Sequence, residues 1–297
     1  MRNTTSNVVF DARNAKCPMM SNKNLGSMGA RLLTALVEEN RQVFSIADAQ
    51  RYLSAYADKP YSYAAANELL RRLGRAGWVV RLSAGRYALV PLTSGNTLTP
   101  QLNRYVIARE VLGNAPYYIS HESAMEVHNL LTHPVGQVLV TTPRRLASRE
   151  ILGIPYRFIY APPVGIWGNE LRWVTPYEQV MVSDLERTLL DGLMRTDLCA
   201  GIGQVATALW MRHDELDGEK LADYAERAHH RAAAQRLGYL LELYGLGTPD
   251  LAARLLGLRG TAYALLDPLL PDEGPYLSRW RLRINIEPET LQSSIRT

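Results

Sequence analysis

The period of the hydrophobic pattern changes at Trp78, and this change restricts what the first quarter of the chain can fold into. Before Trp78, apolar residues recur in three short runs at the spacing of an amphipathic helix. The runs predict helices over residues 29–37, 45–56 and 62–77. The second and third segments each begin with a serine whose hydroxyl can cap the first free backbone amides.

After these runs the pattern alternates with period two, which is typical of strands. Trp78, Val80 and Leu82 are expected on one face, and a Ser-Ala-Gly turn at 83–85 leads into a return strand over 87–89. Three short helices followed by a hairpin are the arrangement of a winged helix-turn-helix. We therefore expect an α+β protein whose residues 28–92 form a winged helix-turn-helix domain, after a flexible arm at 1–27.

A linker at 93–100, rich in small and polar residues, then leads to a C-terminal mixed α/β domain at 101–297. Capping boxes are expected at 175–178 and 183–186, the second opening a helix to about Arg195. Further expected elements are strands over 138–140, 156–160 and 279–286, the last with a basic outer face, and helices over 203–211, 218–228 and 231–244.

Charge is divided unevenly between the two parts. Residues 1–95 carry 13 Lys and Arg against 6 Asp and Glu, net +7, whereas residues 96–297 carry 20 against 23, net −3. This asymmetry favours a polyanionic partner for the first part only. A surface that is merely basic and solvated remains the alternative.

The third predicted helix carries the candidate DNA-binding residues. With its leucines turned inward, Asn67 and three arginines face outward, and Ser62 and Tyr63 lie at the end that usually reaches base edges. Asparagine can pair with adenine, and arginines with guanine or phosphates, whereas Glu68 opposes such contacts unless it is paired. The predicted DNA-binding residues, with one at the mouth of the hairpin, are Ser62, Tyr63, Asn67, Arg71, Arg72, Arg75 and Arg86. A solvated helix face or a protein-binding module would show the same pattern.

Several other classes of protein are disfavoured. Two distant cysteines, Cys17 and Cys199, do not form a disulfide framework or a zinc finger, and fit a reducing cytoplasm. No apolar stretch is long enough to span a bilayer, and the first 25 residues do not resemble a signal peptide. No phosphate loop or nucleophile elbow occurs, and the histidines lack metal-ligand spacing. We expect a soluble intracellular protein that is not an enzyme and uses no metal or cofactor.

Three runs in the second domain carry a resemblance. They are Tyr-Tyr-Ile-Ser-His-Glu-Ser-Ala at 117–124, Val-Ser-Asp-Leu-Glu-Arg-Thr-Leu-Leu-Asp at 182–191 and Gln-Arg-Leu-Gly-Tyr-Leu-Leu-Glu at 235–242. With the predicted winged helix, they resemble the AbiEi antitoxins of type IV toxin–antitoxin systems, and mycobacterial members most of all.

The resemblance implies a protein that represses its own operon by binding inverted repeats in promoter DNA. It also implies neutralisation of a cognate nucleotidyltransferase-like toxin, by direct contact or indirectly. The residues that match the family's C-terminal motifs are Glu186, Arg187, Asp191, Arg236 and Glu242. A capping box and buried arginine–carboxylate pairs would explain the same residues as structural.

Two other functions stay open at this point. The second domain has enough apolar and aromatic residues to form a pocket for a small ligand, which would make the chain a ligand-sensing regulator. A nucleic-acid enzyme would need groups such as His121 or Glu186 to act catalytically, and nothing in their spacing supports this.

Overall fold

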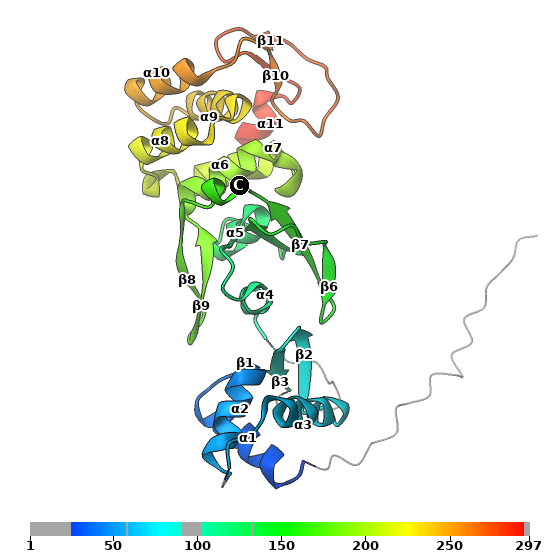
Figure 1. Cartoon of the computed structure of the whole chain (residues 1–297). Coiled ribbons are helices and arrows are strands. Elements are labelled where there is room, and N and C mark those ends of the chain that lie inside the picture. Colours follow the sequence, from blue (N-terminus) through cyan, green and yellow to red (C-terminus); the bar gives the residue numbers. More distant parts are fainter. Residues whose placement is uncertain (1–24, 58, 91–101, 132, 294–297) are drawn as a thin grey trace, which may run out of the picture. The chain divides into compact units, whose positions relative to one another are not determined.

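The structure is a computed structural model that describes residues 25–57, 59–90, 102–131 and 133–293. The chain divides into two compact units between Gln101 and Leu102. Both units combine helices with sheets, so the expected α+β class is confirmed (Figure 1). Most of the predicted arm, and the whole predicted linker, lie outside the described residues.

The described residues of the first unit form three helices and a three-stranded antiparallel sheet with the strand order β1-β3-β2. Its elements are α1 (Ser27–Glu38), β1 (Val43–Ser45), α2 (Ile46–Ala55), α3 (Tyr63–Arg75), β2 (Val79–Ser83) and β3 (Arg86–Leu89). The three helices and the hairpin match the sequence expectation. The short strand β1, which pairs with β3, was not expected.

Serine caps fix where α2 and α3 begin. The Ser45 hydroxyl accepts from Asp48 N at 3.0 Å, and the Asp48 carboxylate accepts from Ser45 N at 2.9 Å, which completes a capping box. The Ser62 hydroxyl accepts from Ala65 N at 3.1 Å. Both predicted caps are confirmed.

The core of this unit lies between the three helices and the sheet. Leu32 and Leu36 of α1 pack with Leu53 of α2 and Leu70 of α3, all fully buried. The predicted strand face is wrong in part, because β2 buries Val79 and Leu82, while Trp78 and Val80 are half-buried. A register shift between Arg81 and Ser83 breaks the alternation.

The second unit begins with a six-stranded mixed sheet, ordered β6-β7-β5-β4-β9-β8. Helices α4, α5 and α6 contact its central strands. The elements of this part are α4 (Arg104–Leu112), β4 (Tyr118–Ile119), α5 (His121–Val127), β5 (Val138–Thr142), β6 (Arg149–Ile151), β7 (Ile154–Tyr160), β8 (Asn169–Thr175), β9 (Glu178–Ser183) and α6 (Leu185–Met194). The predicted strands at 138–140 and 156–160 are therefore confirmed within β5 and β7.

A helical layer and a small three-stranded sheet complete the unit. Figure 1 shows α8, α9 and α10 stacked beyond α6, at the end of the unit away from the tip of the β8–β9 hairpin. The elements are α7 (Ile202–Met211), α8 (Gly218–Ala228), α9 (Arg231–Leu243), α10 (Pro249–Leu258), β10 (Ala264–Leu265), β11 (Tyr276–Leu277), β12 (Leu282–Arg283) and α11 (Pro288–Ser293). The three helices expected here are confirmed.

Three local expectations in this unit are wrong. Thr175 and Glu178 end β8 and begin β9, so the supposed capping box is a hairpin turn. Asp184, not Ser183, caps α6 by accepting from Arg187 N at 2.9 Å. Residues 279–286 are not a continuous strand, because only Leu282–Arg283 pair in the small sheet.

Candidate nucleic-acid interface

The outer face of α3 carries the basic residues that the sequence predicted. Arg71, Arg72 and Arg75 are exposed, whereas Leu69, Leu70 and Leu73 are buried against α1 and α2. The amphipathic pattern of the helix therefore orients the arginines as expected. A row of guanidinium groups along one exposed helix can contact successive phosphates of a nucleic acid.

Glu68 contacts two of these arginines. Its carboxylate lies 2.9 Å from Nη1 of Arg71 and 3.5 Å from Nη2 of Arg75. Arg72 has no carboxylate within ion-pair distance among the residues that the structure describes. Pairing with Glu68 places two arginines side by side, and it also offsets part of their charge.

The first turn of α3 presents Tyr63 and Asn67. Tyr63 is 55% exposed and follows the capping Ser62, so aromatic and hydroxyl groups lie together at the free N-terminus of the helix. Asn67 and Arg71 of α3 line a hollow of about 280 Å³, and Arg81 of β2 is also part of its lining. Sequence reasoning missed Arg81, although it occupies an exposed position in the strand that follows α3.

Arg86 begins β3, directly after the turn of the hairpin. It pairs with Ser83 of β2 and Ser45 of β1, and its side chain is half-buried. The structure thus places it in the middle strand of the sheet, at the hairpin end.

A second group of arginines, not singled out from the sequence, lies in the other unit. Arg144, Arg145, Arg149 and Arg157 are exposed in the β5–β6 loop and in β6 and β7. Arg145 stacks on Tyr160, with its Cζ 4.1 Å from the ring centroid, and none of the four makes an ion pair with a described residue. These four arginines are spread over a 14-residue segment, so they do not form a compact sequence motif.

The C-terminal motif residues lie mostly inside the second unit. Glu186 is buried, and its carboxylate accepts from Lys220 Nζ at 2.7 Å and from Asp217 N at 3.1 Å. Lys220 also reaches Asp184 at 3.2 Å. Burial lowers the pKa of Lys220, but the two carboxylates outweigh it and raise that pKa above the ordinary value. Glu186 therefore joins α6 to the start of α8.

Arg187 and Asp191 form the expected buried pair, with 2.8 Å between Nε and Oδ1. Arg187 also donates to the Tyr118 hydroxyl at 2.9 Å and lies 3.8 Å from the centroid of the Trp167 ring. Burial lowers the pKa of Arg187, but Asp191 and Tyr118 outweigh this and raise it. The guanidinium stays charged and holds β4, α6 and the loop before β8 together.

Arg236 and Glu242 depart from the expected pattern of arginine–carboxylate pairs. Arg236 is buried, but it donates to backbone carbonyls, Leu193 O at 2.7 Å and Leu265 O at 3.0 Å. Burial lowers its pKa. Glu242 is exposed and accepts from Nε of Arg279 at 3.0 Å and from the indole of Trp280. Of these two residues, only Arg236 lies in the interior.

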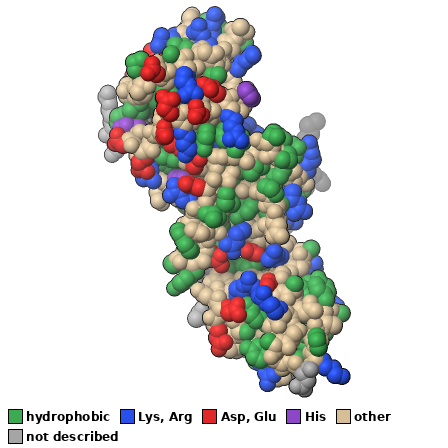
Figure 2. Space-filling model, turned by 60° about the vertical axis from the view of Figure 1, so that its left-hand side comes forward, with side chains coloured by type: hydrophobic (Ala, Val, Ile, Leu, Met, Phe, Trp, Pro, Cys, Tyr) green, Lys and Arg blue, Asp and Glu red, His purple; other side chains and the backbone are tan. Residues whose placement is uncertain are grey.

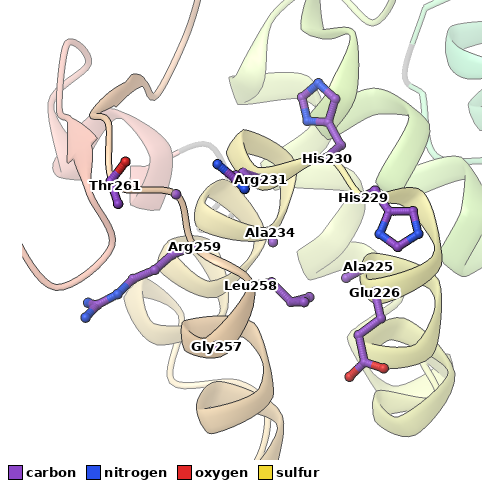
Figure 3. Close-up of a pocket in the computed structure, with 11 residues that line it drawn as sticks. Ala225, Glu226, His229, His230, Arg231, Ala234, Gly257, Leu258, Arg259 and Thr261 are labelled. Carbon is purple, nitrogen blue, oxygen red and sulfur yellow. The ribbon is translucent and has the colours of Figure 1, made fainter.

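A hollow in this unit lies between α8, α9 and the end of α10 (Figure 3). Its volume is about 400 Å³, and its lining includes His229 and His230 of the α8–α9 connection, Arg231 at the start of α9 and Arg259 after α10. The Arg259 side chain points away from the hollow, and its guanidinium donates to Arg279 O at 2.6 Å (Figure 3). Burial lowers the pKa of His230, so that ring is neutral near pH 7. Glu226, the acidic residue of the lining, is held by Arg254 at 2.7 Å.

His121 and Glu186, the two residues considered for catalysis, have separate partners. The His121 ring is buried and bonds to the Ser120 hydroxyl at 2.9 Å, while Glu186 is held by Lys220. Burial lowers the pKa of His121. Within the described residues, no three His, Cys, Asp or Glu side chains come close enough to hold a metal ion. None of the helices in that part of the chain is long and apolar enough to cross a membrane.

No protein-family model and no curated protein matches this chain. Among solved structures, the crystal structure of the RV2827C protein from Mycobacterium tuberculosis is similar, with a TM-score of 0.66 and 18% sequence identity. The match covers 92% of this chain and 96% of that chain. At this identity the likeness shows a shared fold.

Proposed function

We propose that the first unit is a winged helix-turn-helix that binds double-stranded promoter DNA, and that the chain is an AbiEi-like repressor and antitoxin. The observation that carries the DNA-binding part is the exposed face of α3. Three arginines follow one another along it, and Tyr63 and Asn67 lie near its N-terminus. In helix-turn-helix proteins this end reads base edges while later residues contact phosphates.

The hairpin would serve as the wing. Arg86, directly after its turn, and Arg81 on β2 extend the basic surface from α3 to the sheet. The first part of the chain carries net +7, which favours approach to DNA from a distance. The arginines of β6 and β7 are a second candidate surface for phosphates.

The toxin-neutralising part of the proposal rests on the resemblance of the three sequence runs, and the fold shared with the mycobacterial protein is compatible with it. We infer that Glu186, Arg187, Asp191 and Arg236 act by holding this unit together, because each is buried among groups of the chain itself. A partner protein would contact other, exposed residues.

The experiment is binding of the purified chain to a labelled fragment of its own promoter, titrated against salt and nonspecific competitor DNA. Specific binding that weakens with salt and survives competitor would support the proposal. Binding that is absent, or abolished by competitor, would refute the repressor role. Co-expression with the neighbouring toxin gene then tests neutralisation separately.

A second candidate function is regulation by a small anionic ligand. The observation that favours it is the hollow between α8 and α9, with Arg231 and Arg259 on its lining. Promoter binding that changes when anionic metabolites are added, and that stops changing in an Arg231→Ala variant, would support this candidate.

A further inference from the structure

Strand β8 is an edge of the large sheet, and no described strand pairs with its outer side. It is the last strand in the order, and its side chains are exposed over most of its length on both faces, as the pattern from Glu170 to Trp173 shows. An unprotected edge strand presents backbone donors and acceptors that pair readily with another strand. Natural edges are usually blocked by charged side chains, proline, a bulge or a covering element. Residues 169–173 contain no lysine or proline, their two charged residues are of opposite sign, and the register irregularity of β8 comes only after Trp173.

The backbone of β8 alternates between bonding to β9 and facing outward. Asp184 N donates to Gly168 O at 2.9 Å, and β8 pairs with β9 in the register Asn169↔Ser183. In an antiparallel ladder, Glu170 and Arg172 therefore also bond to β9. The N–H and C=O groups of the residues between them face the open edge, and these residues are Asn169, Leu171 and Trp173.

Two backbone groups of β9 bond to side chains on the side away from β8, which agrees with this alternation. Met181 N donates to the Tyr117 hydroxyl at 3.4 Å, and Gln179 O accepts from Arg109 at 2.8 Å. Both groups point away from β8, as expected for the partners of Leu171 and Trp173 in the register. Hydrogen bonds on both sides of β9 therefore indicate that the backbone groups of Asn169, Leu171 and Trp173 face the open edge.

Apolar side chains lie along the same edge. Leu171 is 59% and Trp173 is 63% exposed, on one face of the strand. Figure 2, in which this side of the unit comes forward, shows hydrophobic side chains at the surface there. Large exposed apolar groups beside unpaired backbone favour a partner strand over water.

The charges on the other face are self-complementary. Glu170 and Arg172 are two residues apart on either side of Leu171, and their side chains pair at 2.7 Å within the strand. If two copies of β8 lie antiparallel with Leu171 opposite Leu171, each Glu170 faces an Arg172 of the other copy. Centring the pair on Glu170 or Arg172 would instead oppose like charges, which is destabilising.

We propose that β8 pairs with β8 of a second copy of this chain, antiparallel about a two-fold axis at Leu171, and so joins two six-stranded sheets. A two-fold contact uses the same patch on both partners, which the Glu-Leu-Arg pattern satisfies. In this register Asn169, Leu171 and Trp173 exchange backbone hydrogen bonds across the axis. Glu170 and Arg172 form the closer, non-hydrogen-bonded pairs, where side chains interact most strongly. This proposal does not depend on DNA binding.

The test is the molar mass of the full chain in solution without DNA, by sedimentation velocity over a wide range of concentration. We expect a concentration-dependent twofold rise in mass. Glu170→Arg and Arg172→Glu should each abolish it, because each places like charges opposite one another. Mixing the two variants should restore a dimer. The Glu170→Arg strand then carries two positive charges and faces the two negative charges of the Arg172→Glu strand. The double variant E170R/R172E should dimerise alone.

Matched controls separate pairing from folding. Arg195 and Asp197 are also two residues apart, paired and partly exposed, so Arg195→Glu should leave the mass unchanged. Thermal unfolding of each single variant should match the native chain, because an exposed ion pair contributes little. A chain that stays monomeric at every concentration overturns the proposal. So does a dimer that survives both single reversals, or a mixture of the two variants that stays monomeric.

Discussion

Arg187 and Asp191 lie one turn apart on α6, and their ion pair is almost wholly withdrawn from solvent. Removing one partner of such a pair leaves an uncompensated buried charge. Asp191→Ala should therefore lower the free energy of unfolding by about 3–5 kcal/mol. Chemical unfolding followed by tryptophan fluorescence measures this, since the ring of Trp167 stacks on Arg187.

The exposed pair Arg195–Asp197 provides the control for this prediction. Asp197→Ala should cost under about 1 kcal/mol. Replacing both buried partners by apolar residues, as in R187M/D191L, should recover much of the stability. A small effect of Asp191→Ala would contradict the structural role given to this motif.

The absence of a side chain at Gly238 of α9 lets the indole ring of Trp280 pack directly against the helix. A Cβ at this position of α9 would overlap the ring of Trp280, which is 1% exposed. Gly238→Ala should therefore destabilise the second unit by about 3 kcal/mol, the upper end of the usual cost of overpacking. Gly257 is also in a helix, and apart from its chain neighbours and the backbone of its own helix no described atom lies within 4 Å of its added Cβ, so Gly257→Ala should be neutral or stabilising. Equal melting temperatures for the two variants would show that Trp280 can move aside.

The capping box of α2 predicts a specific dependence on pH. Burial raises the pKa of Asp48, but hydrogen bonds from Ser45 and Arg41 outweigh it and lower the pKa from 3.8 to about 2. The ionised carboxylate therefore stabilises the fold above the unfolded pKa, and this contribution disappears as the pH falls toward 2.

We accordingly expect Asp48→Asn to destabilise the first unit at neutral pH. The difference in unfolding free energy between this variant and the native chain should shrink between about pH 5 and pH 2. Denaturant unfolding at a series of pH values measures it. A difference that is constant with pH would mean that the carboxylate charge plays no part in the cap.

Glu68 limits the proposed DNA surface, because it pairs with Arg71 and Arg75. Glu68→Gln should strengthen promoter binding several-fold, while Arg72→Ala should weaken it. Removing one arginine–phosphate interaction should flatten the slope of log affinity against log salt by about 0.9. Arg51→Ala, an exposed arginine of α2, is the matched control. Stronger binding after Arg72→Ala would exclude α3 as the contact helix.

Local signals in the sequence were enough to place the helices of the first unit. Ser45 and Ser62 cap through bonds to residues three positions on, so the whole motif is visible in a short segment. The inward face of α3 likewise follows from the spacing of its leucines. Strand β1 was missed because its three residues acquire strand structure only by pairing with β3, much later in the chain.

Long-range contacts also explain the errors in the second unit. Residues 175–178 contain all the elements of a capping box, but pairing of the flanking strands makes them a hairpin turn. The alternation at 279–286 predicts a strand, yet Arg281 has φ +50°, which interrupts it before Leu282. The carbonyl partners of Arg236 come from α6 and β10, and no sequence spacing reveals them.

The contact between Gly238 and Trp280 has a consequence for how the chain matures during synthesis. N-terminal domains generally fold first as a chain emerges from the ribosome. The described strands and helices of the first unit end at Leu89, whereas the space beside Gly238 of α9 stays unfilled until Trp280 has been made. A newly made chain would therefore have a completed first unit while the core of its second unit is still open.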